Sequence, residues 1–330
     1  AYGGAAVGMA VAVTEFLRGT LSLSGTLSIV LLASEFFLPL RLLGSFFHIA
    51  MNGMAASDKI FSILDLPEPE DGEKTLPAGP LDVALQDVHF SYEADREILK
   101  GIDLSLSAGS FVSLVGESGC GKSTVAGILG GRNRGYSGSV TVGGIPLSQV
   151  REEELMKRVV LVRSNSYLFK GTVEENLKMA KPDATKEEME TVLQKVNLLG
   201  FLETQAGLQT QLLEKAANLS GGQCQRLAIA RALLRREASV YIFDEAASNI
   251  DVESEALIME VIHELAKTKT VLLISHRLAN VVQSDKIYFL RDGEIQESGT
   301  HEELMAAKGA YSRLFDSQMA LECYGKGGVA

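Results

Sequence analysis

Apolar and polar positions divide the chain into two stretches. Residues 1–64 are mostly apolar, and their uncharged runs cover residues 1–14, 19–34 and 42–57. None of these runs reaches the ~18 residues of an unambiguous membrane-spanning helix. We nevertheless expect a truncated spanning helix at 1–17, an outer turn at 18–24 and a long spanning helix at 25–64, kinked at Pro39. The alternative is a buried helical domain of a soluble protein.

The remainder of the chain alternates between strand-like and helix-like patterns. Residues 65–80 hold four of the seven prolines and are typical of a linker. Strand-like runs lie at 81–92 (with a break at Gln86–Asp87), 110–116, 238–245 and 270–276, and a hairpin with a turn at Asp292–Gly293 covers 286–299. Helical patterns cover 186–203, 222–236, 252–267 and 301–320. Strands that alternate with helices predict an α/β domain with a largely parallel sheet over 81–318, followed by a tail at 319–330.

Charge follows the same division. Residues 1–64 hold only 6 of the 73 charged residues, so the net charge of −11 comes from the rest of the chain. This acidic balance argues against a nucleic-acid partner, and three scattered cysteines indicate neither a disulfide framework nor a zinc site. The chain begins with Ala and shows no signal-peptide pattern, so we expect it to be the C-terminal part of a longer protein.

The strongest chemical signal is GESGCGKST, which follows the apolar run FVSLVG and precedes a helical stretch. Glycines in such a loop let backbone amides converge on phosphates at a helix N-terminus. Lys122 would reach the β- and γ-phosphates, and the Ser123 hydroxyl would bind Mg²⁺. Cys120 sits where a thiolate would be stabilised, or is a small residue that simply fits. The predicted nucleotide-binding residues here are Gly116, Glu117, Ser118, Gly119, Cys120, Gly121, Lys122, Ser123 and Thr124.

A second signal is VYIFDE at 240–245, a buried strand that ends in two acids. Asp244 would hold Mg²⁺ through water beside the phosphate-binding loop. Glu245 would orient and deprotonate the attacking water.

A third signal is LSGGQ at 219–223, which opens another helix. Its free amides would form a second anion site, contributed by Ser220, Gly221, Gly222 and Gln223. Two chains arranged head to tail could place this site over the partner's phosphates. The alternative is an ordinary helix N-cap by Ser220.

These motifs, in this order with His276, resemble the ATP-binding cassette (ABC) nucleotide-binding domain over residues 81–318. The resemblance implies a P-loop α/β fold with a mixed sheet core and a helical subdomain, preceded by transmembrane helices as in exporters. It also implies that Tyr92 stacks on adenine and that Asp251 faces a dimer partner. His276 would contact the γ-phosphate, and the catalytic residues would be Lys122, Glu245 and His276. Ser164 departs from the glutamine that this family usually has, which puts coupling to the membrane domain in doubt.

A closer resemblance is to the CydDC-type exporters, which are tied to cytochrome bd assembly. It is carried by SEFFLPLRLLGSFFHIAMNGMAASDKIF, NSYLFKGTVEENL and EKAANLSGGQCQRLAIARALL. It implies a multi-pass protein of the bacterial cytoplasmic membrane with its cassette in the cytoplasm, using ATP and Mg²⁺. The partner would be a second half-transporter, in a heterodimer or a homodimer, and the cargo a thiol such as cysteine or glutathione. The alternatives are a haem, lipid or multidrug exporter, or a soluble ABC ATPase.

The long apolar helix carries one polar stripe. At 100° per residue, one face about 60° wide collects Ser34, Arg41, Ser45, His48 and Asn52. Polar side chains within spanning helices usually face a bundle interior or a water-filled path. We expect Arg41, Ser45 and His48 to line a cargo path, or else to pack against polar groups of helices outside this chain.

Overall fold

The structure is a computed structural model, and it describes residues 2–66, 71–93, 95–248 and 250–326. The side chains at 2, 34, 37, 38, 40, 41 and 321–326 lie outside this description. The chain divides into two compact units, residues 1–70 and residues 71–330, which are taken in turn.

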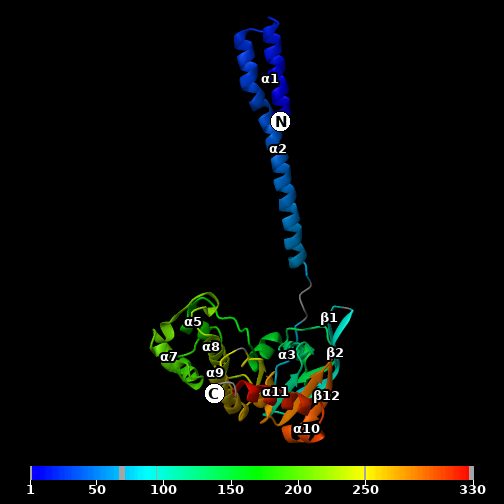
Figure 1. Ribbon diagram of the computed structural model, residues 1–330, viewed down its shortest axis with the longest axis vertical. Helices are drawn as coiled ribbons and strands as arrows, with labels where there is room; N and C mark the ends of the chain where they lie inside the picture. Colours follow the sequence, from blue (N-terminus) through cyan, green and yellow to red (C-terminus); the bar gives the residue numbers. More distant parts are fainter. Residues whose placement is uncertain (1, 67–70, 94, 249, 327–330) are drawn as a thin grey trace. The chain divides into compact units, whose positions relative to one another are not determined.

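The first unit is a helical hairpin of α1 (Tyr2–Leu17) and α2 (Leu23–Leu64), which lie side by side over the length of α1 (Figure 1). Ser22 caps α2, because its side chain accepts a hydrogen bond from the Gly25 amide at 3.2 Å. The small side chains of Ala5 and Ala12 are buried in this unit, whereas most of its large apolar side chains are exposed. No helix within the described residues combines the length and the apolar composition needed to cross a membrane.

The second unit is built on a six-stranded sheet in the order β12-β11-β3-β10-β9-β6. Its strands are parallel except for β12, which runs antiparallel to β11. Their bounds are β3 (Phe111–Gly116), β6 (Val159–Arg163), β9 (Val240–Asp244), β10 (Thr270–Ile274), β11 (Lys286–Arg291) and β12 (Glu294–Gly299). The hairpin predicted at Asp292–Gly293 is therefore confirmed.

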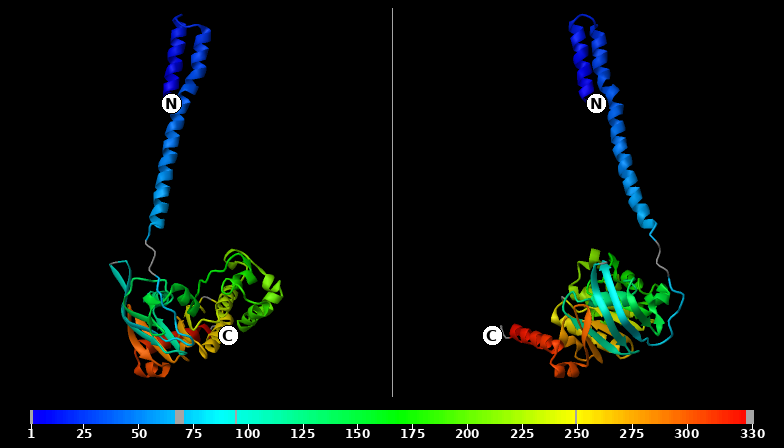
Figure 2. Two further views of the ribbon diagram at one scale, coloured as in Figure 1. Left: turned by 180° about the vertical axis from the view of Figure 1, so that it is seen from behind. Right: turned by 90° about the vertical axis from the view of Figure 1, so that its right-hand side faces the viewer.

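A second sheet is antiparallel, in the order β2-β1-β4-β5, and lies across one side of the unit (Figure 2, right). Its strands are β1 (Val83–Glu93), β2 (Arg96–Leu106), β4 (Ser137–Val142) and β5 (Ile145–Pro146). The predicted break in β1 is a register shift between Leu85 and Val88, where Asp87 takes φ 48°. The sequence patterns did not identify β2, β4 or β6. A further short pair joins β7 (Gly171–Thr172) to β8 (Gln211–Leu212).

The helices α5, α7 and α8 gather at one end of this unit, away from β1 and β2 (Figure 1). Two predicted helices prove to be broken. The pattern at 186–203 splits where Asn197 takes φ 51°, and the pattern at 301–320 splits where Lys308 takes φ 52°, because a left-handed residue ends a right-handed helix. The bounds are α3 (Lys122–Leu129), α4 (Glu152–Arg158), α5 (Val173–Lys178), α6 (Lys186–Lys195), α7 (Leu199–Glu203), α8 (Gly221–Leu233), α9 (Val252–Ala266), α10 (His301–Ala307) and α11 (Ala310–Lys326).

Strand β9 is buried on both faces of the central sheet. Tyr241 and Phe243 pack into a core shared with the helices, whereas Val240 and Ile242 pack into a core shared with the antiparallel sheet. Burial on both faces explains why the parallel strands are nearly continuous apolar runs. The two cores fix the carboxyl ends of the strands, and the loops that leave this edge carry most of the predicted site.

Candidate nucleotide-binding site

The phosphate loop, residues 116–124, joins β3 to α3 in a conformation that requires glycine. Gly116 and Gly121 take φ 149° and 112°. A Cβ at Gly116 would lie 2.0 Å from the Leu290 carbonyl oxygen, and one at Gly121 would lie 2.6 Å from Leu99 Cδ2. Any larger residue would therefore push the loop away from the sheet.

Lys122 turns back into this loop. Its ammonium group is buried and donates hydrogen bonds to the carbonyl oxygens of Gly116 (2.9 Å) and Glu117 (2.7 Å). Anionic phosphate oxygens accept a hydrogen bond from an ammonium more strongly than neutral carbonyls do. The loop thus holds a positive charge ready to be redirected to a phosphate.

Cys120 does not have the environment predicted for a reactive thiolate. Its side chain is buried, and this burial raises the pKa of the thiol above its ordinary value of 9.0, although the nearby Lys122 charge opposes the shift. Of the two alternatives for Cys120, burial of the thiol therefore favours a small residue that fits its position over a stabilised thiolate.

Asp244 meets Ser123 at the end of β9. The Ser123 hydroxyl donates to Asp244 Oδ1 at 2.9 Å, which brings together the two groups predicted to hold Mg²⁺. Burial raises the pKa of Asp244, while the Ser123 hydrogen bond and the Arg163 charge oppose that shift. Mg²⁺ is usually held by one or two protein oxygens together with phosphate oxygens and water. This pair of neighbouring oxygens fits that pattern.

Glu245 and His276 form a pair beside Asp244. The Glu245 carboxylate contacts His276 Nε2, and the Glu245 amide donates to the Ile274 carbonyl at 3.0 Å. Glu245 takes φ 55°, a left-handed conformation that costs on the order of 1–3 kcal/mol in a non-glycine residue. The strand end thus directs two consecutive acids differently, one to Ser123 and the other to His276.

Tyr92 lies at the edge of the same region. Its ring is exposed, and its hydroxyl group bonds to Thr124 Oγ1 (3.3 Å) and accepts from Asn133 Nδ2 (3.1 Å). The ring packs edge-on against Phe90 with centroids 4.9 Å apart. One aromatic face is thus fixed near the start of α3 and remains available to a planar ligand.

The signature segment, residues 219–223, does not join this site within the described chain. Ser220 and Gln223 cap each other, with Ser220 Oγ accepting from the Gln223 amide (3.2 Å) and Gln223 Oε1 accepting from the Ser220 amide (2.9 Å). A Cβ on Gly222 would lie 3.4 Å from Asp251 Oδ2, which places Asp251 beside the signature segment. Among the described residues, no hydrogen bond or ion pair links this segment to the phosphate loop.

The predicted cargo residues belong to the other unit. Ser45 and His48 are exposed on α2, and the rings of His48 and Phe47 lie 6.1 Å apart. The side chain of Arg41 lies outside the described residues.

Sequence patterns missed three residues that support the site. Arg163 Nε lies 3.7 Å from Asp244 Oδ2. Gln225, buried in α8, donates to the Arg163 carbonyl at 3.1 Å. Gln318, on α11, donates to the His276 carbonyl at 2.7 Å and accepts from the Leu278 amide at 2.9 Å. The one sequence signal for these contacts was that Arg163 directly precedes Ser164, the position where the family usually has glutamine.

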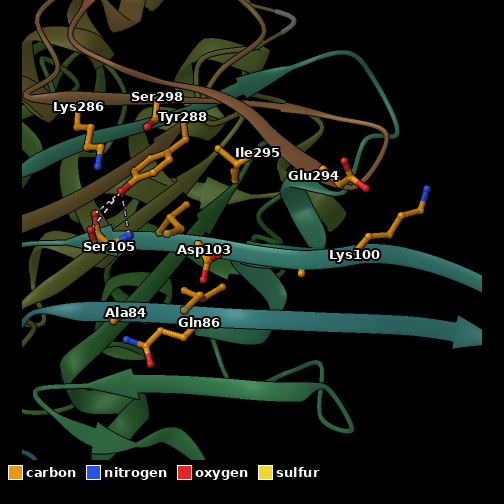
Figure 3. A pocket seen from close by; sticks show the side chains of 13 residues that line it. Ala84, Gln86, Lys100, Asp103, Ser105, Lys286, Tyr288, Glu294, Ile295 and Ser298 are labelled. Atoms are coloured by element: carbon orange, nitrogen blue, oxygen red, sulfur yellow. Dashed lines mark hydrogen bonds between the residues drawn. The ribbon is translucent and has the colours of Figure 1, made fainter.

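A separate cavity of about 620 Å³ lies between β2 and the β11–β12 hairpin (Figure 3). The Tyr288 hydroxyl accepts a hydrogen bond from the Ser105 amide at 3.1 Å on its wall. None of the predicted site residues lines this cavity.

Comparison with known proteins gives concordant results. Residues 99–248 match the ABC transporter family. The chain is 48% identical over 98% of its length to an uncharacterised ABC transporter ATP-binding protein of Haemophilus influenzae, of which it covers 58%. It is 39% identical over 84% of its length to an ATP-dependent lipid A-core flippase of Vibrio parahaemolyticus, of which it covers 48%. The chain thus spans about half the length of the curated relatives it matches.

A solved structure is also similar. A bacterial Atm1-family ABC exporter with ATP bound matches 95% of this chain and 55% of its own, with a TM-score of 0.74 and 29% sequence identity.

Proposed function

We propose that the chain is an ATPase and the C-terminal part of an ABC exporter half-transporter; residues 99–248 match the ABC transporter family, and the relatives it resembles include an ATP-dependent flippase. ATP binding would close a cassette dimer, and hydrolysis would reopen it. The observation that carries this proposal is the convergence of the phosphate loop, Asp244 and the Glu245–His276 pair at one edge of the sheet.

The residues take distinct roles in this proposal. The amides of residues 116–124 and the Lys122 ammonium bind the phosphates, and Tyr92 stacks on the base. Ser123 and Asp244 would hold Mg²⁺, which supplies charge that offsets the phosphates. Glu245 accepts a proton from the attacking water, while His276 holds that carboxylate in place and reaches toward the terminal phosphate.

A second chain completes the site in this proposal. The signature segment and Asp251 form their contacts away from the phosphate loop of their own chain. Ser220 and Gln223 use their amides in the capping box, so the amides of Gly221 and Gly222 at the start of α8 would serve a partner's nucleotide. The partner is a second half-transporter, identical or not.

We place the helical unit in a bacterial cytoplasmic membrane, as the end of a membrane domain whose cassette lies in the cytoplasm. Support comes from its exposed apolar side chains, such as Leu43, Phe46, Ile49 and Met54, and from the exporter that matches 95% of the chain. Cell fractionation tests this placement. Release of the full-length protein by carbonate alone would contradict it, whereas a requirement for detergent would support it.

The comparisons lend no support to the thiol cargo or the cytochrome bd role predicted from the sequence. Relatives with a stated cargo are lipid A-core flippases, so an amphipathic lipid is the cargo we propose to test first. The full-length protein in lipid discs would be assayed for ATPase stimulation by lipid A, glutathione, cysteine and haem. Stimulation by a thiol alone would overturn the lipid assignment.

The polar stripe predicted on α2 provides a sharper test of the cargo path. Arg41→Ala should abolish cargo-stimulated ATPase and leave the basal rate near that of the wild type, because Arg41 lies far from the cassette in sequence. His48→Ala should weaken a haem site but hardly affect a lipid site. Unaltered stimulation and transport in both variants would assign the stripe to packing.

Nucleotide binding tests the site itself. Lys122→Ala should weaken binding of fluorescent methylanthraniloyl-ATP at least about tenfold, because charged hydrogen bonds contribute about 1.5–3 kcal/mol. Lys195→Ala, on the exposed face of α6, is the control. Equal affinity of the two variants would remove Lys122 from the site.

A further inference from the structure

Strand register places Arg163 beside Asp244, one of the two residues predicted to hold Mg²⁺. Arg163 is the last residue of β6 and the direct neighbour of Asp244 in the parallel pairing of β6 with β9. Neighbours in register project from the same face of a sheet. The Ser164 amide donates to the Asp244 carbonyl at 3.1 Å, which fixes this alignment just beyond the strand.

The backbone of Arg163 is held on both sides. Its carbonyl accepts hydrogen bonds from Gln225 Nε2 (3.1 Å) and from Ser166 Oγ (2.8 Å). Gln225 is only 4% exposed, so its side chain is held in place by the packing around it. The side chain therefore leaves from a fixed point next to Asp244.

The guanidinium contact is electrostatic and incompletely satisfied. Arg163 Nε lies 3.7 Å from Asp244 Oδ2, beyond hydrogen-bonding distance. This nitrogen is buried and has no hydrogen-bond partner. A buried donor without a partner is costly, so it is available to an acceptor that enters the site.

The two oxygens of Asp244 are thus divided between different partners. Oδ1 accepts from Ser123, while Oδ2 faces the positive charge of Arg163. A divalent cation that approaches this carboxylate competes with that charge and is repelled by it. A tetra-anionic nucleotide without its metal is attracted by the same charge.

We propose that Arg163 is a charge-compensating positioning residue that makes ATP binding unusually independent of Mg²⁺. This inference rests on the proposed binding of ATP at the phosphate loop. Arg163 strengthens the binding of metal-free ATP and weakens the binding of Mg²⁺ to the same site. Both effects bring the affinity for ATP without Mg²⁺ closer to the affinity for ATP with Mg²⁺.

The test measures the equilibrium affinity of the full chain for methylanthraniloyl-ATP in excess Mg²⁺ and in EDTA. In the wild type, the two dissociation constants should differ by less than about fivefold. Arg163→Gln should raise their ratio by about tenfold, the lower end of the one to three powers of ten by which a neighbouring Arg charge changes the affinity of a carboxylate for a proton. Direct titration with Mn²⁺, followed by electron paramagnetic resonance, should show tighter metal binding in Arg163→Gln.

Two further variants separate charge from structure. Arg163→Lys retains the charge and should keep the wild-type ratio. Arg313→Gln removes an equal charge from the exposed face of α11 and should also keep it. If Arg163 only ties the edge strand to β9, Arg163→Gln would lower the thermal midpoint and leave the ratio unchanged, which overturns the inference.

The outcome also distinguishes this inference from the proposed function. Absence of nucleotide binding in both Mg²⁺ and EDTA would refute the proposed site. A wild type that binds ATP but loses more than about a hundredfold in affinity in EDTA would refute the role of Arg163 alone.

Discussion

Gln318 ties the C-terminal helix α11 to the loop that carries His276. Its side-chain amide donates to the His276 carbonyl at 2.7 Å, and its oxygen accepts from the Leu278 amide at 2.9 Å. Leu278 itself is 1% exposed, so water cannot easily replace the lost partner of its amide. Gln318→Met preserves the length of the side chain and removes both hydrogen bonds. We expect this variant to loosen the loop without unfolding the domain.

The magnitude follows from the two contacts. Each neutral hydrogen bond contributes about 0.5–1.5 kcal/mol, so the loop loses about 1–3 kcal/mol relative to its open states. At about 1.4 kcal/mol per factor of ten, opening becomes about 5-fold to 150-fold more frequent. Because the Leu278 amide is buried and would be left without a partner, we expect the increase in loop opening to lie in the upper part of this range. The ATPase rate should fall by no more than the same factor, because closed loops remain competent.

Hydrogen exchange of the Leu278 amide measures the opening directly. Gln318→Met should speed this exchange, while amides of β3 and β9 keep their wild-type protection. Gln296→Met, on the exposed side of β12, is the matched control and should leave Leu278 unchanged. Exchange at Leu278 within about twofold of the wild type in Gln318→Met would show that the tether has no energetic role.

Four other outcomes are expected. Glu245→Gln should keep nucleotide affinity and lose turnover by about 10²–10⁴-fold, the usual contribution of a general base; activity above about a tenth of the wild type would contradict that role. ATPase activity per chain should fall on a hundredfold dilution, because the proposed complete site needs two chains; constant activity per chain would argue for a site within one chain. Burial lowers the pKa of His263, which packs edge-on against Phe111, so the folded state takes up its proton less readily than the unfolded state does. Stability should therefore decrease as the pH falls through about 6.5, and denaturant titrations near pH 7.5 and about pH 5.5 should show a smaller difference in His263→Leu. Because burial raises the pKa of Cys120, iodoacetamide at neutral pH should label it at least about tenfold more slowly than free cysteine, and equal rates would contradict this burial.

The sequence alone predicted a phosphate-binding loop and the fold class around it, and the structure has the strand and helix that this prediction requires on either side of the loop. GESGCGKST between a β-rich run and a helical run is a local pattern, and its glycines, lysine and serine are defined by spacing along one segment. The buried strand at β9 was likewise visible, because a strand covered on both faces is a continuous apolar run. The hairpin at Asp292–Gly293 needed only its turn residues.

Local patterns failed where one residue in a left-handed conformation interrupts a stretch that otherwise has helical spacing. The stretches at 186–203 and 301–320 have helical spacing throughout, yet Asn197 and Lys308 adopt left-handed conformations there. Helix periodicity indicates which face of a helix is buried, but it does not reveal a single residue with a left-handed conformation. Strand β2 was missed for a related reason, because one of its faces is open to solvent and its charged residues obscure the pattern.

The supporting contacts of the site were decided by tertiary structure. Arg163 and Asp244 are 81 residues apart in the chain and become neighbours only through the register of β6 on β9. Gln318 reaches the His276 loop because α11 packs beside it, 42 residues further along the chain. For Cys120 the sequence left a stabilised thiolate and a small fitting residue open; burial, which raises the pKa of the thiol, favours the second, and burial depends on what the rest of the chain places over a residue. Sequence spacing determines which groups are present on a loop, whereas strand register, helix packing and desolvation determine which charges meet.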